Sequence, residues 1–156
     1  MGWLKFLLGG LIIVFCMVLS YFASEKYRLR KNFYQQFERF HELYLTELQY
    51  RRKALKDVIE EGAYTGEFAK VVCQVLQNKT VEIKCAFLSE EERSDGEYYF
   101  SVLGRGDVYS QTAFFSSKTQ ELAKKKSECE AIAKERTQLY LKLGLLSGLA
   151  FVILII

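Results

Sequence analysis

The sequence contains no proline in its 156 residues, a single histidine and four cysteines. The absence of proline removes the strongest helix breaker and favours long, unbroken helices. A zinc site needs closely spaced pairs of ligands, and no C-x-x-C pair occurs. The motifs of serine hydrolases, zinc peptidases and phosphate-binding loops are also missing. We therefore expect no metal, no cofactor and no enzymatic activity.

Charged residues are scarce at both ends of the chain. The stretch 25–136 holds all 19 acidic residues and 20 of the 22 basic ones. The net charge of +3 is too mild for a nucleic-acid binder, which would need a clustered basic surface. The pattern predicts two apolar ends around a nearly neutral, soluble middle block.

The first apolar end is an uncharged run from Leu7 to Ala23. Extended toward the amino terminus, it is long enough to cross a hydrocarbon core of roughly 30 Å. We therefore predict a first transmembrane helix over residues 3–23. The alternative is a cleaved signal peptide, but residues 20–24 (SYFAS) offer only a poor cleavage site.

The second apolar end, residues 139–156, carries one charge, Lys142, and is predicted to be the second transmembrane helix. Gly144 and Gly148 form a G-x-x-x-G pair, which lets two helix backbones approach closely. Its partner could be the first segment, where Gly9 and Gly10 offer another patch of small residues.

Basic residues set the expected topology. Lys26, Arg28, Arg30 and Lys31 directly follow the first segment, and Lys134, Arg136 and Lys142 lead into the second. By the positive-inside rule the middle block is cytoplasmic and both termini lie outside the cytoplasm. Thiols are reduced there, whereas an external domain would allow a Cys73–Cys85 disulfide.

The middle block begins with the pattern of one long helix over residues 24–61. Its apolar positions recur at helical spacing, and charged residues occupy the opposite face. The predicted inner face comprises Phe33, Phe37, Phe40, Tyr44, Leu48, Leu55 and Ile59. The predicted outer face comprises Glu38, Arg39, Glu42, Glu47, Arg52, Lys53 and Asp57. His41 is expected to be a partly exposed helix residue.

Residues 67–88 permit two interpretations. Alternating apolar and polar residues over 81–87 indicate a strand, and a hairpin across Asn78–Lys79 is conceivable. No third strand is visible, so two short helices are favoured, with Asn78 or Thr80 capping the second. Ser89, followed by three glutamates, is typical of a further helix start.

The last helix is predicted to begin after a turn at Gly104–Gly106. Asp107 caps it, and it continues without glycine to Tyr140 and on into the second apolar end. Its inner face should contain Phe115, Leu122, Cys129 and Ile132, with Lys124 to Lys126 exposed. The sequence therefore predicts an all-α protein: an antiparallel helical bundle over 24–138 between two transmembrane helices.

Three motifs resemble one family. Residues 99–111, YFSVLGRGDVYSQ, contain an L-G-x-(S/G)-D-x-x-x-Q signature at Leu103, Gly104, Asp107 and Gln111. The ending from residue 139 is similar to L-Y-x-x-L-G-x-L-x-G-L, and Glu47 and Tyr50 match an E-x-x-Y pair. In these residues and in the order of its parts, the chain resembles the stage III sporulation protein AB family.

The resemblance implies a non-enzymatic membrane platform in the channel between mother cell and forespore, needed for endospore formation. It implies a location in the mother-cell membrane that surrounds the forespore. The implied partners are a sister AAA-type ATPase and other membrane subunits, and the cytoplasmic domain should be similar to platform proteins of type II secretion and type IV pilus systems. Whether the protein is a homo-oligomer is left open.

The ATPase contact is expected at the end of the bundle where both long helices meet, on geometric grounds alone. The residues expected there are Arg51, Arg52, Lys53, Asp57 and Arg105. The alternative function is a small membrane sensor or regulator whose helical domain binds a ligand or partner. That function would need a pocket with convergent polar groups.

Overall fold

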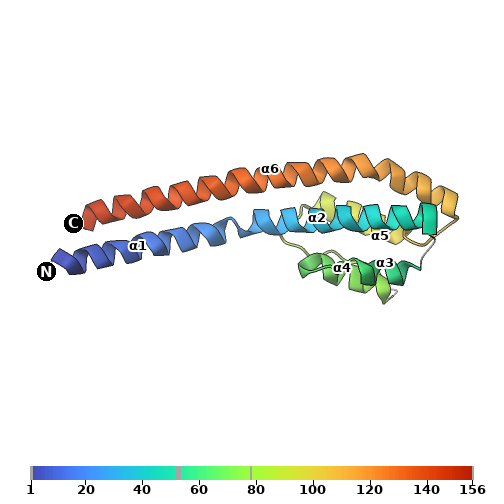
Figure 1. The fold of residues 1–156 in the computed structure, drawn as a ribbon, viewed down its shortest axis with the longest axis horizontal. Helices are drawn as coiled ribbons and strands as arrows, with labels where there is room; N and C mark the ends of the chain where they lie inside the picture. The colour runs from blue at the N-terminus through green and yellow to red at the C-terminus, as the bar shows by residue number, and fades with distance from the viewer. Residues whose placement is uncertain (1, 52–53, 78, 156) are drawn as a thin grey trace. The chain divides into compact units, whose positions relative to one another are not determined.

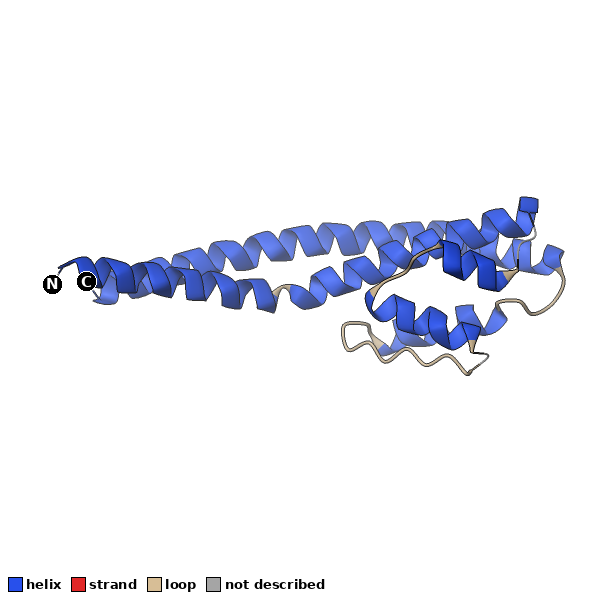
Figure 2. Ribbon diagram, turned by 60° about the horizontal axis from the view of Figure 1, so that its bottom comes forward, coloured by secondary structure: helices blue, strands red, loops and turns tan. Residues whose placement is uncertain are grey.

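The computed structural model describes residues 2–51, 54–77 and 79–155. Within these residues every regular element is helical and no strand occurs, as Figure 2 shows, so the all-α prediction is confirmed. Figure 1 shows the elements in chain order. They are α1 (Gly2–Ala23), α2 (Glu25–Thr46), the π-helical turn η1 (Glu47–Arg51), α3 (Leu55–Glu61), α4 (Gly66–Leu76), α5 (Glu90–Val102) and α6 (Val108–Ile155).

The chain divides into two compact units, which are described separately. Unit 1 comprises Met1–Leu29 and Cys129–Ile156, and unit 2 comprises Arg30–Glu128. The 48-residue helix α6 contributes its first part to unit 2 and its remainder to unit 1.

The core of unit 2 is a cluster of aromatic rings. Phe40 and Phe115 are completely buried, and Phe68 is 1% exposed. The ring of Phe37 lies 4.8 Å from that of Tyr99, centroid to centroid, in an edge-to-face arrangement. Each buried ring of this size contributes about 1.5–3 kcal/mol by leaving water. The predicted inner face of α2 is therefore confirmed from Phe33 to Tyr44.

The single helix predicted over 24–61 is wrong in its continuity. At its start, a turn at Ser24, whose hydroxyl donates to the carbonyl of Tyr21 at 2.8 Å, separates it from α1. Within it, α3 starts anew at Leu55, after the extended residue Ala54. Near Thr46, whose hydroxyl donates to the Glu42 carbonyl at 2.8 Å, α2 passes into the π turn. Such side-chain bonds to the backbone compete with helical ones and bend helices. The π turn also shifts the register, because it adds a residue to one turn.

The segment after α4 is neither a second helix nor a hairpin. Residues 79–88 are irregular, although Ile83 and Cys85 are buried and Glu82, Lys84 and Ala86 beside them are exposed. Side chains replace a partner strand. Gln74 accepts from the amide of Glu82 at 2.8 Å, and the Glu97 carboxylate accepts from the amide of Ile83 at 2.8 Å. Thr80 therefore caps no helix, and Asn78 lies outside the described residues.

Both later helix starts agree with their predicted caps. The Ser89 hydroxyl accepts from the amide of Glu92 at 3.2 Å, and the Glu92 carboxylate accepts from the amide of Ser89 at 3.0 Å. This reciprocal arrangement is a capping box. The carboxylate of Asp107 accepts from the amide of Ser110 at 3.1 Å, at the start of α6.

The inner face predicted for α6 is confirmed at Phe115, Leu122 and Cys129 but wrong at Ile132, which is 37% exposed. Ala133 is buried instead. The reason is geometric, because a seven-residue spacing drifts by about 20° per heptad on a straight helix. After the two seven-residue steps from Phe115 to Cys129, the next residue that faces inward is therefore Ala133, four residues later, and not Ile132, three residues later.

Unit 1 is an antiparallel pair formed by α1 and the carboxyl-terminal part of α6. A Cβ atom added to Gly9 would lie 3.3 Å from Val152, and one added to Gly148 would lie 3.1 Å from the Cα of Ile13. Farther along, a Cβ at Gly144 would overlap the Ser20 hydroxyl. Residues of increasing number along α1 thus contact residues of decreasing number along α6, as in an antiparallel pair, and small residues lie at the contacts.

Within the described residues, one helix qualifies as a membrane span by length and composition. This helix is Val108–Leu154. A second span is obtained if the bent pair Leu7–Ala23 and Glu25–Tyr50, which meet at 40°, is counted as one.

Candidate functional site: the tip of unit 2

The tip, defined here as η1 together with residues 103–111, lies where α2 ends and α6 begins. Its backbone turns sharply at Gly104 and Gly106, which have φ angles of 70° and 93°. These angles lie in the left-handed region, where side chains with a Cβ are disfavoured. Leu103 is 8% exposed and fixes the start of the turn in the core. The two glycines therefore allow a compact turn between α5 and α6.

Gln111 ties this turn to α2. Its side-chain nitrogen donates to the carbonyl of Arg105 at 2.9 Å, and its side-chain oxygen accepts from the Tyr44 hydroxyl at 2.5 Å. Gln111 is 5% exposed. Burial raises the pKa of Tyr44, and a backbone hydrogen bond from Gly104 partly offsets this effect. This arrangement explains the four-residue spacing between Asp107 and Gln111 in the motif. Asp107 caps α6, and Gln111, one helical turn later, faces inward.

The motif carboxylate remains charged at the tip. The Ser110 hydroxyl donates to Asp107 at 2.6 Å, and this bond, with the Ser110 amide, lowers the pKa of Asp107. An ionised carboxylate favours the amino-terminal end of a helix. Asp107 therefore acts as a helix cap, and the adjacent Arg105 is exposed.

Glu47 and Tyr50 point to opposite environments. Glu47 is 3% exposed, so its predicted place on the outer face is wrong, and the π turn that carries it is the cause. Tyr50 is 79% exposed. Tyr109 is 86% exposed, and it is not among the site residues predicted from the sequence. Its position could have indicated this exposure, because Val108 and Tyr109 follow the Asp107 cap directly and no earlier turn of the helix covers them.

The structure describes only some of the residues expected to contact a partner. Arg105 and Asp57 are exposed. Arg51 ends the π turn, and Arg52 and Lys53 lie outside the described residues. The described part of the tip thus presents two exposed aromatic rings and one guanidinium.

An open cleft of about 590 Å³ begins beside the tip. Leu55, Phe100 and Leu103 contribute apolar lining, and Lys79 and Arg105 contribute cations. The other lining residues come from α4, α5 and the irregular segment: Val75, Thr80, Val81, Ser94, Glu97, Tyr98 and Ser101. The volume falls in the range of small-molecule sites.

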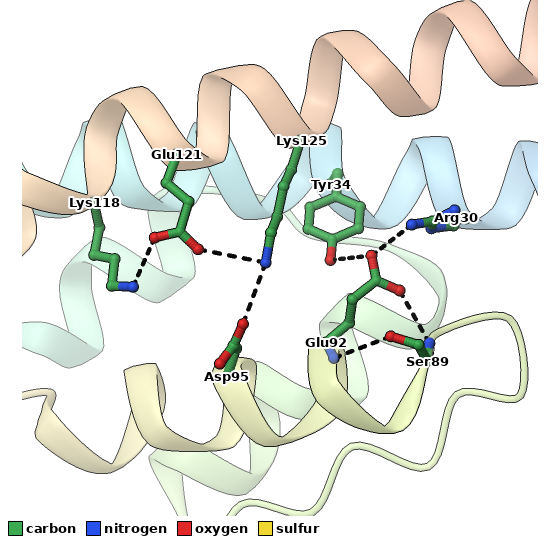
Figure 3. A network of polar contacts seen from close by, with 8 residues as sticks. All are labelled: Arg30, Tyr34, Ser89, Glu92, Asp95, Lys118, Glu121 and Lys125. Atoms are coloured by element: carbon green, nitrogen blue, oxygen red, sulfur yellow. Dashed lines mark hydrogen bonds and ion pairs between the residues drawn. The ribbon is translucent and has the colours of Figure 1, made fainter.

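Two polar clusters fasten α5 to α2 and α6 (Figure 3). Glu92 accepts from Arg30 at 2.6 Å and from the Tyr34 hydroxyl at 2.8 Å. Burial raises the pKa of Glu92, but the Ser89 amide and these two donors outweigh burial and lower it. The same side chain therefore completes the capping box and joins α5 to α2.

The second cluster contradicts the expected exposure of the lysine run. Lys125 Nζ lies 3.3 Å from Asp95 and 3.4 Å from Glu121, and Lys126 Nζ lies 2.7 Å from Glu38. Lys124 alone keeps a highly exposed side chain, at 78%. Lys125 faces α5 and Lys126 faces α2, because the first part of α6 packs against these helices within unit 2.

His41 is completely buried, which corrects the expected partial exposure. Its Nδ1 lies 2.9 Å from the Tyr99 hydroxyl and its Nε2 lies 3.0 Å from the Thr119 hydroxyl. Thr119 also donates to the Phe115 carbonyl at 3.4 Å, so a neutral imidazole protonated on Nε2 satisfies every group. Burial lowers the pKa of His41, opposed by Glu38.

Within the described residues, no group of three or more histidine, cysteine or acidic side chains could hold a metal ion. Cys73 is exposed and Cys85 is buried, and the structure forms no disulfide between them.

The fold defines an all-α protein with a helical bundle, unit 2, and an apolar antiparallel helix pair, unit 1. The model of the stage III sporulation protein AB family matches residues 5–156, and the chain belongs to this family. It is therefore a sporulation-related protein. Comparisons with curated proteins and with solved structures return no match.

Proposed function

We propose that the protein is a non-enzymatic platform subunit of the channel between mother cell and forespore. In this proposal, unit 1 is a membrane hairpin and unit 2 is a cytoplasmic docking domain. The tip binds the cytoplasmic ATPase, and the complex contains other membrane subunits. The observation that carries the proposal is the motif turn. Its inward residues, Leu103 and Gln111, fix it to the core, while Tyr50, Tyr109 and Arg105 remain exposed around it.

Exposed tyrosine and arginine are the residue types that contribute most at protein interfaces. A rigid support also lowers the entropy that is lost when a surface binds. The bond from Tyr44 to Gln111 and the bond from Gln111 to Arg105 provide such support from within unit 2. These features favour recognition of a protein rather than turnover of a substrate.

The proposed topology follows the positive-inside rule and places both termini outside the cytoplasm. Cys73 is exposed in unit 2 and therefore reports on its compartment. An impermeant thiol reagent should leave Cys73 unlabelled in intact cells and label it after permeabilisation. A Cys73→Ser variant is the control for background labelling. Labelling of Cys73 in intact cells would place unit 2 outside and overturn the topology.

The docking proposal is tested by purifying the tagged protein from mildly solubilised sporulating cells and identifying associated proteins by mass spectrometry. We expect the ATPase and other membrane subunits of the channel to be recovered. Recovery of the protein alone, from several mild detergents, would contradict the proposed platform.

The second candidate function is a small membrane sensor, which the cleft of about 590 Å³ favours. Ser101 is exposed and lines this cleft, so a Ser101→Trp variant should fill it. If the variant still binds the ATPase but blocks sporulation, the sensor function is favoured. Normal binding and normal sporulation would leave the platform as the better account.

A further inference from the structure

In unit 1, the uncharged stretches of the two antiparallel helices end at about the same height along the helix pair. On α1 the uncharged run ends at Ala23, and on α6 the last charged residue is Lys142. The rings of Tyr27 and Tyr140 meet at a centroid distance of 6.3 Å, which places Lys26, Arg28 and Lys142 within about one turn of this contact. Tyrosines and cations collect at this depth in membrane proteins, where lipid headgroups lie.

The side chain of Arg28 is held toward the apolar run. It reaches back across the helix break at Ser24, and its guanidinium carbon lies 3.8 Å from the centre of the Tyr21 ring. Its Nε is buried and has no hydrogen-bond partner among the described residues. Lys26 is over the ring of Tyr27 at 5.0 Å. Tyrosine faces thus hold two of the three cations without neutralising them.

One carboxylate, Glu25, lies among these three cations, so positive charge is in excess. The structure shows no ion pair from Lys26, Arg28 or Lys142 to any described carboxylate. An arginine guanidinium can bind two phosphate oxygens at once, whereas lysine acts as a point charge. The headgroup phosphate of a lipid lies next to the hydrocarbon region, which is the depth at which Arg28 is held.

We propose that Arg28 binds the phosphate of an anionic phospholipid as a bidentate donor, and that Lys26 and Lys142 add positive charge at the same depth. This inference rests on the proposed function, because it requires unit 1 to be a membrane hairpin. Each juxtamembrane cation strengthens binding to an anionic surface by about fivefold.

The test uses the full-length protein in vesicles of phosphatidylcholine that contain a small amount of spin-labelled phosphatidylglycerol or spin-labelled phosphatidylcholine. The immobilised fraction of each spin label measures which lipid the protein prefers. We expect a preference for phosphatidylglycerol in the wild type and its loss in the variant Lys26→Gln/Arg28→Gln/Lys142→Gln. Arg28→Lys keeps the charge but not the bidentate geometry, so it should retain part of the preference.

The control variant Lys56→Gln/Lys70→Gln/Lys84→Gln removes the same charge from exposed lysines of unit 2 and should keep the full preference. Equal loss of preference in both triple variants would overturn the site. Suppression of the wild-type preference by added inorganic phosphate would show a site for free phosphate and overturn the lipid assignment. Carbonate extraction separates the two proposals, because protein that is stripped from the vesicles contradicts the membrane hairpin. Inserted protein without any lipid preference contradicts the site alone.

Discussion

Units 1 and 2 are both helical, but their helices are held together by opposite kinds of side chain. Unit 2 buries large rings, among them Phe40, Phe68 and Phe115. Unit 1 brings its helices together at Gly9, Gly144 and Gly148. The single helix α6 takes part in both modes, with a phenylalanine near its start and glycines near its end.

The difference is the one expected if unit 2 lies in water and unit 1 lies in a lipid bilayer. In water, burying a large ring is favourable, and rings fill a core efficiently. In a bilayer, burial of apolar surface from lipid brings no such gain, so close packing of small residues holds helices together. The contrast in packing residues therefore agrees with the proposed split between a membrane hairpin and a cytoplasmic bundle.

The largest effect should follow from emptying the aromatic core. Phe40→Ala removes a completely buried ring and should lower the free energy of unfolding of unit 2 by about 3–5 kcal/mol. Denaturant titration of the purified protein, followed by circular dichroism, measures this change. Tyr98→Ala, at a 61% exposed ring, is the control and should cost less than about 1 kcal/mol. Equal losses would contradict the assignment of the core.

The next effect should be confined to unit 1. Gly148→Leu brings a side chain against the backbone of Ile13 and should cost about 1–3 kcal/mol of helix packing. In a Cys16→Ser background, oxidation of a Gly9→Cys/Val152→Cys pair reports the contact, and its rate should fall. A Cβ at Gly10 meets nothing within 4 Å, so Gly10→Leu is the control. An unchanged rate in Gly148→Leu would refute the antiparallel contact.

The third effect depends on pH and belongs to unit 2. Burial lowers the pKa of His41 below 6.5, so above that pH the imidazole is neutral in both states. As the pH falls below 6.5, the unfolded chain binds a proton that the folded unit does not. Stability should therefore fall by at most about 1.4 kcal/mol per pH unit, down to the folded pKa.

Unfolding measured between pH 7 and the onset of carboxylate titration, near about pH 4.5 to 5, tests this dependence. His41→Gln should be less stable at neutral pH but should show a flatter dependence on pH. The same slope in wild type and variant would exclude His41 as its source.

The smallest effect should come from a helix cap. Ser89→Ala removes the acceptor for the Glu92 amide and should cost about 1 kcal/mol. The Ser117 hydroxyl donates to the nearby Phe114 carbonyl on an exposed face, so Ser117→Ala should change stability little. Thermal unfolding of both variants measures the difference. A larger loss for Ser117→Ala would contradict the capping box.

Local patterns in the sequence predicted much of the fold. The spacing of Phe33, Phe37 and Phe40 is that of a helix face, and Ser89 and Asp107 precede helices with recognisable capping residues. These signals act within a few residues and need no knowledge of the rest of the chain.

The misses depend on partners from elsewhere in the chain. The irregular segment takes its hydrogen bonds from the side chains of Gln74 and Glu97, so its backbone needed neither helix nor strand. His41 is buried because hydroxyl groups 58 and 78 residues away satisfy both of its nitrogens. The burial of Glu47 and the exposure of Tyr50 follow from a π turn that no periodic pattern indicated.

The most direct test of the platform account is a quantitative comparison of ATPase recovery by tip variants. Tyr109→Ala and Arg105→Ala change exposed side chains beside a turn that Gln111 still holds, so unit 2 should remain folded. Together they should reduce recovery of the ATPase strongly, while Lys84→Ala, which removes an exposed cation elsewhere in unit 2, should not. Recovery at the wild-type level by a folded Tyr109→Ala/Arg105→Ala variant would contradict docking at the tip.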